Sequence, residues 1–467
     1  MSRRGTTIAL AWTPERAGTP TWPLIAVAVI VLGAGAAACL VSPKLGVAAL
    51  ALPAVPLLVL APEMALLALV VILPFDTLGS LDESSTLSAT RLVGTAVLGG
   101  WVLHVMAHPR RRVRLGRPGL LLLAYVAFAT LSIGWAADTD ITLTALRTLA
   151  QLFLLYVMAA NVLDDWSRIA RALDALLLST TVLSLFVLVQ NEGSGAGRAV
   201  LHVGDYSTNP NALAVQLALS AVASLAFRAR HTTLGWWRLA AVVPIGLAVL
   251  ATGSRGGALA AGAGLVTLAV VRPRVGVRAL AALALVALLL PAVVPGTMLA
   301  RMRARWEATE EDRLSGRLDI WRVGLAMIED RPVQGTGFAG FRDAFYEYMI
   351  ETSVDPRFAL IHSRGNRAAH NLYVCTFAEL GLAGGALLVF ALAAHGRSVW
   401  QLHRAARQVG HSHAEDVALA LLAALATLVT AGFNTDILLP RTPWLLLGAM
   451  QGAAIAAGWD GQQEVRT

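Results

Sequence analysis

Apolar runs of 17 or more residues recur along the whole chain. At a rise of about 1.5 Å per residue, roughly 20 helical residues cross the ~30 Å apolar core of a bilayer. Only 14% of the residues are charged, whereas soluble domains have about 25%. A transmembrane β-barrel would need segments of about 10 residues with alternating polarity. The pattern therefore predicts an all-α fold, a polytopic transmembrane helical bundle.

About fourteen apolar runs lie between charged or Pro/Gly-containing breaks, at 22–41, 45–60, 62–76, 90–107, 118–136, 142–162, 172–190, 208–227, 238–252, 256–271, 279–296, 371–395, 416–433 and 443–458. The second and third are short and rich in proline. If they form one hairpin or a re-entrant pair, the chain has twelve spans. We divide the chain into N-terminal spans (1–204), central spans (205–296), a long polar loop (297–370) and C-terminal spans with a tail (371–467).

The distribution of arginine and lysine predicts the orientation of the chain. With the N-terminus in the cytoplasm, cytoplasmic segments hold 20 of these 37 residues and short external loops hold five. Eleven more lie in segment 297–369, but loops longer than about 60 residues are largely exempt from the positive-inside rule. A single lysine and a high alanine content suggest a GC-rich bacterial genome. We expect a protein of the bacterial cytoplasmic (inner) membrane with both termini inside, the long loop outside and no cleavable signal.

The long loop is polar but is expected to fold. Ser315 can cap a helix whose apolar positions share one face, namely Leu318, Trp321, Leu325 and Ile328. A turn-forming cluster follows at 332–337, and a second amphipathic stretch then carries Phe338, Phe341, Phe345 and Tyr348. An aromatic stripe beside a bilayer usually anchors a segment at the interface. We expect a small helical cap on the outer face of the bundle, and the alternative is a passive connection.

The segment Thr252–Gly257 divides two apolar runs at the predicted outer surface. Its glycines allow a tight reversal and close approach of another backbone. The planar guanidinium of Arg255 matches the oxygens of a phosphate group, which indicates anion binding, and Ser254 is a neighbouring candidate contact. The alternative is an arginine that reaches outward to lipid phosphates.

His370 and Asn371 open the span that follows the long loop. A neutral imidazole can act as a general base near neutral pH. His370 is therefore a candidate catalytic residue, and Asn371 is a candidate substrate contact. A histidine at a helix start also serves as a cap or an interface residue, and His362 is a weaker competitor for the catalytic role.

Other polar residues lie inside spans or at their ends. Arg147 lies within an apolar span, where an ionisable side chain is costly and needs an internal partner. Substrate contact and structural pairing explain Arg147 equally well. Asn209 and Asn211 begin another span, where capping of the helix explains them better than substrate contact. Arg317 is a further candidate on the first loop helix.

Several common chemistries have no sequence support. The chain has no P-loop, dinucleotide-binding glycine fingerprint or H-E-x-x-H motif. It also lacks a G-x-S-x-G nucleophile elbow and a clear inverted repeat of broken spans. Cys39 and Cys375 both lie in apolar runs, so a disulfide framework is not indicated.

Taken together, these residues resemble the O-antigen ligase and O-antigen polymerase superfamily of membrane glycosyltransferases. The resemblance rests on Ser254-Arg255-Gly256 at an outer hairpin, Ser315-Gly316-Arg317 with Trp321 in the long loop, Pro332, Gly335 and Gly337, His370-Asn371, and Glu379-Leu380-Gly381. It covers roughly residues 205–458, whereas the N-terminal third matches in hydropathy alone. The usual span count of the superfamily is about twelve.

The resemblance implies glycan transfer outside the cytoplasm from a polyprenyl-diphosphate-linked donor to an acceptor hydroxyl. Arg255 and Arg317 would bind the diphosphate and stabilise its growing charge. His370 would take the proton of the acceptor. No cofactor or metal is required in this scheme. The expected partners are the lipid-linked donor, a glycan, lipid or cell-wall acceptor, and the bilayer, with no nucleic acid.

The sequence is compatible with three kinds of function. A glycosyltransferase would act either as a polymerase, which extends a glycan on its carrier, or as a ligase, which moves the finished chain to another acceptor. A transporter or flippase would place functional charges near the bilayer midplane. A scaffold protein would not need a folded loop with several arginines. The concentration of candidate polar residues at the outer surface favours the enzyme.

Overall fold

The computed structural model describes residues 60–78, 89–108, 112–190, 199–203, 206–227, 233–293, 317–352, 368–436 and 440–459, with the single residues 296, 300 and 438. The fold is all-α, as predicted. Its helices are α3 (Pro62–Ile72), η1 (Leu73–Leu78), α4 (Ala89–Ala107), α5 (Arg117–Leu131), η2 (Ser132–Gly134), α6 (Thr139–Val162), α7 (Trp166–Gln190), α8 (Pro210–Leu225), α9 (Thr233–Ala251), α10 (Arg255–Val271), α11 (Pro273–Val293), α14 (Arg317–Asp330), α15 (Phe341–Glu351), α17 (Leu372–Gln408), α18 (Ser412–Ala431) and α19 (Arg441–Ala456). The two-residue strands β1 (His202–Val203) and β2 (Tyr206–Ser207) pair in the turn before α8.

The third to fourteenth predicted spans each coincide with a helix. Five helices are long and apolar enough to cross a membrane (α5 with η2, α6, α7, α17 and α18), and five shorter apolar helices accompany them among the described residues. The proline-rich third span forms α3 and η1. The run 22–41 and all but the last residue of 45–60 lie outside the described residues. The chain is a multi-pass membrane protein.

Close packing in the bundle depends on small residues, as is usual in membranes. Gly448 and Gly452 of α19, four residues apart, face α6. A Cβ atom at Gly448 would lie 2.7 Å from the carbonyl oxygen of Tyr156, and one at Gly452 would lie 2.3 Å from that of Leu163. Gly264 of α10 packs in the same way on Thr427 of α18. These glycines let the helix backbones approach closely.

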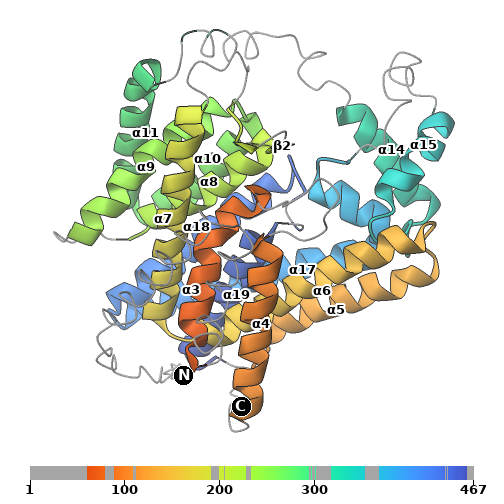
Figure 1. Ribbon diagram of the computed structural model, residues 1–467, viewed down its shortest axis with the longest axis horizontal. Coiled ribbons are helices and arrows are strands. Elements are labelled where there is room, and N and C mark those ends of the chain that lie inside the picture. Colours follow the sequence, from red (N-terminus) through yellow and green to blue (C-terminus); the bar gives the residue numbers. More distant parts are fainter. Residues whose placement is uncertain are drawn as a thin grey trace, which may run out of the picture.

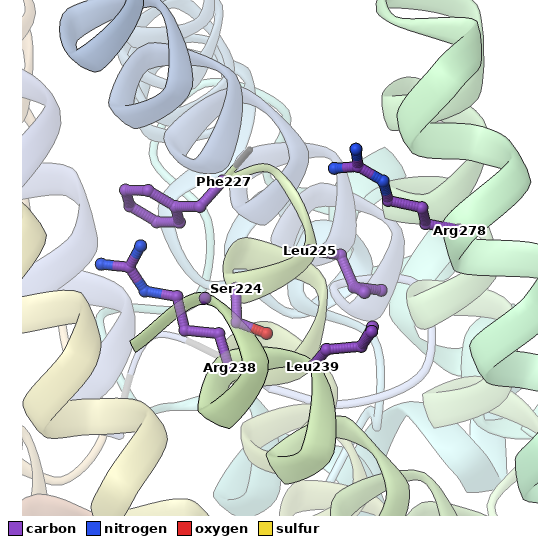
Figure 2. A pocket seen from close by; sticks show the side chains of 7 residues that line it. Ser224, Leu225, Phe227, Arg238, Leu239 and Arg278 are labelled. Carbon is purple, nitrogen blue, oxygen red and sulfur yellow. The ribbon is translucent and has the colours of Figure 1, made fainter. Parts of the chain in front are cut away.

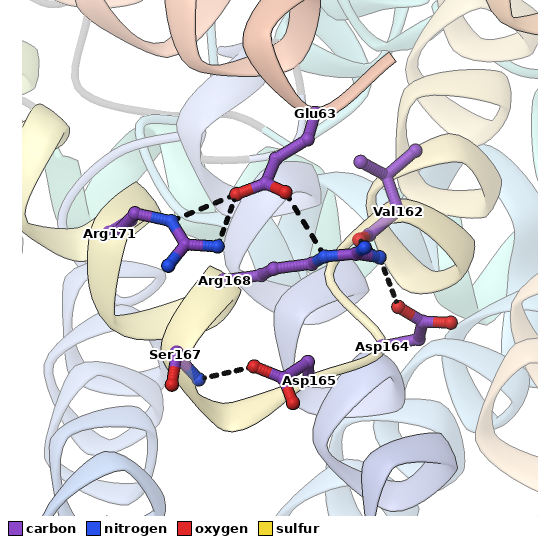
Figure 3. Close-up of polar contacts among 7 residues, drawn as sticks. All are labelled: Glu63, Val162, Asp164, Asp165, Ser167, Arg168 and Arg171. Atoms are coloured by element: carbon purple, nitrogen blue, oxygen red, sulfur yellow. Dashed lines mark hydrogen bonds and ion pairs between the residues drawn. The ribbon is translucent and has the colours of Figure 1, made fainter. Parts of the chain in front are cut away.

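The helix starts and ends define two ends of the bundle. The starts of α8 and α10 are joined by a hydrogen bond, and the start of α17 bonds to the end of α18. We call this the site end. At the opposite end, Glu63 at the start of α3 lies between Arg168 and Arg171 of α7 (Figure 3). The Nε atoms of these arginines lie 3.1 and 2.9 Å from its carboxylate oxygens. Because all three side chains are partly exposed, each pair contributes only about 0–1 kcal/mol.

The long loop folds as predicted into a small helical unit, the cap subdomain, which comprises α14, a turn at 331–340 (the cap turn) and α15. Figure 1 shows α14 and α15 together beside α17, and α8 to α11 as another group. The cap subdomain has its own apolar core, formed by Ile320, Val323, Met327, Phe341, Phe345, Tyr348, Met349, Ala369 and Ala378. Since two of these residues precede or belong to α17, the core also holds the subdomain on the bundle.

One expectation about this region was wrong. The aromatic residues Phe341, Phe345 and Tyr348 are buried inside the protein and do not anchor it in the bilayer interface. Leu318 and Leu325 of α14 are exposed, because the helix turns the face of Ile320, Val323 and Met327 inward. Periodicity locates an amphipathic helix, but α17 decides which of its apolar residues are covered.

Helix α17 is interrupted at Gly381, whose φ of 60° lies in the left-handed region. The cap turn fills the interruption. The amides of Thr336 and Gly337 donate to the carbonyls of Ala378 and Glu379 at 2.9 and 2.8 Å, and the amide of Leu382 donates to Pro332 at 2.7 Å. Backbone groups released by a broken span need partners within the protein. The two glycine-containing motifs at 332–337 and 379–381 therefore form a single interlocked structure.

Candidate active site

The hairpin before α10 is built by side-chain capping. Ser254 accepts from the amide of Gly257 at 3.1 Å and donates to Oδ1 of Asn211 at 2.9 Å. Asn209 accepts from the amide of Asn211 at 2.9 Å and so caps α8, as the sequence predicted. The structure thus brings together Ser254 and Asn211, which are 43 positions apart.

The glycines of the hairpin are required by close contacts. Gly253 has φ of 61°, which fits the tight reversal predicted from the sequence. A Cβ atom at Gly256 would lie 2.5 Å from Cβ of Asn434, and one at Gly257 would lie 2.4 Å from Cβ of Ala214. The start of α10 is therefore pressed against α8 on one side and the α18–α19 turn on the other.

Arg255 and Arg317 are the first residues of α10 and α14. They lie within electrostatic range, because the positive charge of Arg255 lowers the pKa of the Arg317 guanidinium, after the larger effect of partial burial. Among the described residues, neither guanidinium forms a hydrogen bond or an ion pair with a protein group. Two neighbouring cations without a carboxylate partner, each at the positive end of a helix, are suited to binding an anion.

His370 has a strained backbone. Its φ of 49° lies in the left-handed region, which residues other than glycine seldom adopt. Residues on either side of it are held in place. The indole Nε1 of Trp321 donates to the carbonyl of Ala369 at 3.0 Å, and the amide of Leu372 donates to the carbonyl of Gly432 at 2.7 Å. Asn371 is buried and caps α17 by accepting from the amides of its first turn. Strained residues of this kind cluster at functional sites.

The α18–α19 turn connects these parts of the site. Gly432 binds the start of α17, and Asn434 contacts Gly256 at the start of α10. The segments that carry His370 and Arg255 therefore pack against the same turn. Helix α14 carries both Trp321, which binds Ala369, and Arg317, so the cap subdomain also contributes to this end of the bundle. Four separate parts of the sequence meet at the site end.

Two acidic residues near the site had no assigned role from the residues alone. The buried carboxylate of Glu379 accepts from the amide of Phe341 at 3.3 Å, so it fastens the cap turn to α17. Asp436 accepts from the amide of Leu438 at 3.2 Å. Burial raises the pKa of Asp436, and the Leu438 hydrogen bond and the charge of Arg342 partly offset this. Neither role was predictable from local patterns, because the Glu379 contact and the Arg342 influence on Asp436 join residues far apart in the sequence.

The position of Arg147 differs from the prediction that it has an internal partner. It lies on the exposed face of α6 and, among the described residues, has no hydrogen bond or ion pair. The sequence predicted an internal partner, but the packed side of α6 is formed by residues such as Leu146 and Leu149. Ser315 and His362 lie outside the described residues.

Two other features argue against an anion-binding or metal-binding site elsewhere in the described structure. A small pocket lies at the opposite end, lined by Ser224, Leu225, Phe227, Gly235, Arg238, Leu239 and Arg278 (Figure 2). In this pocket Arg238 is already neutralised by Asp174, with both nitrogen–oxygen distances at 2.7 Å. Within the described ranges, no three His, Cys, Asp or Glu side chains are grouped closely enough to hold a metal ion.

Residues 240–389 match the family model described as O-antigen ligase. No curated protein matches the chain. Among solved structures, it is similar to a chain from "Structural coordination of polymerization and crosslinking by a peptidoglycan synthase complex", with 19% identity, a TM-score of 0.38 and coverage of 74% of this chain and 97% of that chain. The resemblance to the O-antigen ligase and polymerase superfamily is confirmed by the family model for residues 240–389, which include Arg255, Arg317 and His370.

Proposed function

We propose that the protein transfers a glycan from a polyprenyl-diphosphate-linked donor to an acceptor hydroxyl. The observation that carries the proposal is the position of Arg255 and Arg317 at the starts of two helices at the end of the bundle where His370 lies, within electrostatic range of each other and with no acidic partner among the described residues. The match to the O-antigen ligase family model over the same residues supports glycan transfer as the reaction class.

In this mechanism the two arginines bind the diphosphate of the donor. Each guanidinium presents a planar set of donors to phosphate oxygens, and the starts of α10 and α14 add the partial positive charge of their helix ends. The same groups stabilise the negative charge that develops on the diphosphate as it leaves. The positive charge needed for departure is supplied by the protein, so the scheme requires no metal.

His370 acts as the general base. Its imidazole takes the proton of the acceptor hydroxyl, whose oxygen forms a bond to the anomeric carbon. The bond from that carbon to the diphosphate oxygen breaks, and its electron pair stays on the leaving polyprenyl diphosphate. A direct displacement inverts the configuration at the anomeric carbon. The apolar bundle holds the polyprenyl chain.

We also propose that the site end faces outward in a bacterial cytoplasmic membrane and that both termini lie inside. This orientation rests on the excess of arginine in the segments at the opposite end. It would place the acceptor, whether a glycan, a lipid or a cell-wall polymer, outside the cytoplasm. A transporter has less support, because Arg147, the candidate charge inside an apolar span, lies on an exposed helix face.

The test compares lipid-linked and surface glycans in a deletion strain complemented with wild type, Arg255→Ala or His370→Ala. We expect wild type to restore the profile and both variants to fail while the proteins remain in the membrane. Single repeat units on the carrier would identify a polymerase, and long chains retained on the carrier would identify a ligase. A normal glycan profile with His370→Ala would show that His370 is not the general base. A deletion that changes no glycan would overturn the assignment.

A further inference from the structure

We infer that Trp321 is the positioning residue for His370, and that one turn of α14 sets both the base and the anion site. This inference rests on the proposed function. Arg317 and Trp321 are four residues apart on a helix and therefore lie on the same face. Arg317 is electrostatically coupled to Arg255, and Trp321 binds the residue before His370.

The hydrogen bond acts on the peptide group that precedes the base. The carbonyl of Ala369, which accepts from the Trp321 indole at 3.0 Å, belongs to the same planar peptide as the amide nitrogen of His370. Rotation of this plane changes φ of His370. Because φ of 49° is disfavoured for a residue with a Cβ atom, the surrounding contacts must maintain it.

The other side of His370 is fixed independently of the cap subdomain. Leu372 is bonded to Gly432, and the Asn371 side chain caps α17. If the indole donor is lost, α17 keeps its place and the Ala369–His370 peptide loses the hydrogen bond that ties it to Trp321. The imidazole would then leave the geometry that general-base catalysis requires, while the arginines would stay where they are.

Helix α14 itself does not depend on this hydrogen bond. A Cβ atom at Gly324 would lie 2.5 Å from Cγ1 of Val374, so the helix rests directly on α17. Ile320, Val323 and Met327 are buried on the same side. The loss of one indole donor should therefore leave the cap subdomain folded, which makes the inference testable by substitution.

The experiment uses Trp321→Phe, which keeps an aromatic ring and removes the N–H donor. The matched control is Trp135→Phe, because the Trp135 indole also donates to a backbone carbonyl of the cap subdomain, that of Gln334, at 3.1 Å. A second variant carries 3-benzothienylalanine at position 321, which replaces the N–H with sulfur and keeps the shape of the ring. This second variant replaces Trp321→Phe in the experiment if the phenylalanine variant does not fold.

Kinetics are measured on the full chain in liposomes, with the lipid-linked glycan extracted from the deletion strain as the donor. We expect kcat of Trp321→Phe to fall by about 10- to 100-fold, the scale of a small displacement of a catalytic group, while KM and the binding of undecaprenyl diphosphate stay at the wild-type level. Trp135→Phe should retain the wild-type kcat. Equal kcat values for the two variants would overturn the inference, as would a rise in KM or weaker diphosphate binding for Trp321→Phe.

A second readout does not depend on the reaction. Diethylpyrocarbonate modification of His370, quantified by mass spectrometry, should change several-fold in Trp321→Phe and remain unchanged in Trp135→Phe. Equal modification rates would reject Trp321 as a positioning residue even if glycan transfer is established. A normal glycan profile with both Arg255→Ala and His370→Ala would instead reject the proposed function, and the modification rates would still decide whether Trp321 controls the His370 backbone.

Discussion

At the scale of residues, the candidate site depends on charges and backbone angles that the protein maintains at a cost. Partial burial and the charge of Arg255 both disfavour the protonated form of Arg317. The left-handed φ of His370 adds a conformational cost. Such costs are characteristic of binding sites that are prepared for a ligand before it arrives, and they lead to two predictions about Arg317.

The first prediction concerns the pH dependence of Arg317→Lys. The environment that lowers the pKa of the arginine should also lower the pKa of a lysine, which starts near 10.4 and not above 12. The lysine variant should therefore lose its charge, and with it kcat/KM, as pH rises toward the ordinary lysine pKa of about 10.4, while wild type does not. Arg322→Lys, an exposed residue of the same helix paired with Asp319, is the control. Parallel profiles for wild type and Arg317→Lys would contradict the prediction.

The second prediction concerns stability without substrate. Because the folded state disfavours the charge on Arg317, the substitution Arg317→Gln should raise the melting temperature by up to a few degrees. Adding undecaprenyl diphosphate should stabilise wild type and not the variant, since a ligand of the folded state raises its stability. Arg322→Gln removes an exposed pair and should change little. A lower melting temperature for Arg317→Gln would argue against the electrostatic cost.

At the scale of elements, the interruption of α17 and the cap turn form one unit. Gly335 and Gly381 both have left-handed φ angles and face each other's segments. A Cβ atom at Gly335 would lie 2.4 Å from the carbonyl oxygen of Glu379, and one at Gly381 would lie 2.3 Å from that of Val333. The cap subdomain is therefore anchored inside the bundle, and its base should not open as a hinged lid.

The third prediction separates this contact from backbone strain alone. Gly335→Ala should destabilise the protein by about 1–2 kcal/mol from its left-handed conformation and about 1–3 kcal/mol more from the clash. Gly410→Ala shares the positive φ, 73°, but its Cβ would meet open space, so it should show the smaller effect alone. Melting temperature and the yield of monodisperse protein provide the measurement. Equal losses in the two variants would show that the close approach does not matter.

At the scale of the whole molecule, the two ends of the bundle differ in chemistry. Among the described residues, the site end has two arginines within electrostatic range of each other and without carboxylate partners, whereas at the opposite end Arg168, Arg238 and Arg272 are paired with acidic residues. The arginine of the opposite-end pocket is among those neutralised. Anion binding is therefore expected at one end of the molecule.

The fourth prediction tests the orientation of these ends. Single cysteines are introduced at Ala137, exposed beside the cap turn, and at Gln408, exposed at the end of α17, in a chain whose Cys39 and Cys375 are replaced. In intact cells, or spheroplasts where an outer membrane is present, a membrane-impermeant maleimide should label Ala137→Cys and should label Gln408→Cys only after lysis. The reverse pattern would place the site end in the cytoplasm and reject the proposed sidedness.

Much of the architecture was predictable because it depends on local properties of the chain. A run of apolar residues long enough for a bilayer forms a helix wherever it packs, so the third to fourteenth spans coincide with helices. The N-cap roles of Asn209 and Ser254 follow from short-range chemistry as well. Arg255 and His370 were candidates because charged or titratable groups at span ends are costly and seldom incidental.

The remaining features come from contacts between residues far apart in sequence. The hydrogen bond from Trp321 to Ala369, the insertion of the cap turn at Gly381 and the approach of Arg317 to Arg255 each join separate segments. The exposed position of Arg147 and the burial of Phe341 and Phe345 are likewise set by neighbouring helices. Hydropathy acts locally, so the order of residues was enough to locate the helical segments and the candidate charges. Tertiary structure alone decided which charges meet, because no local pattern encodes the packing of one helix on another.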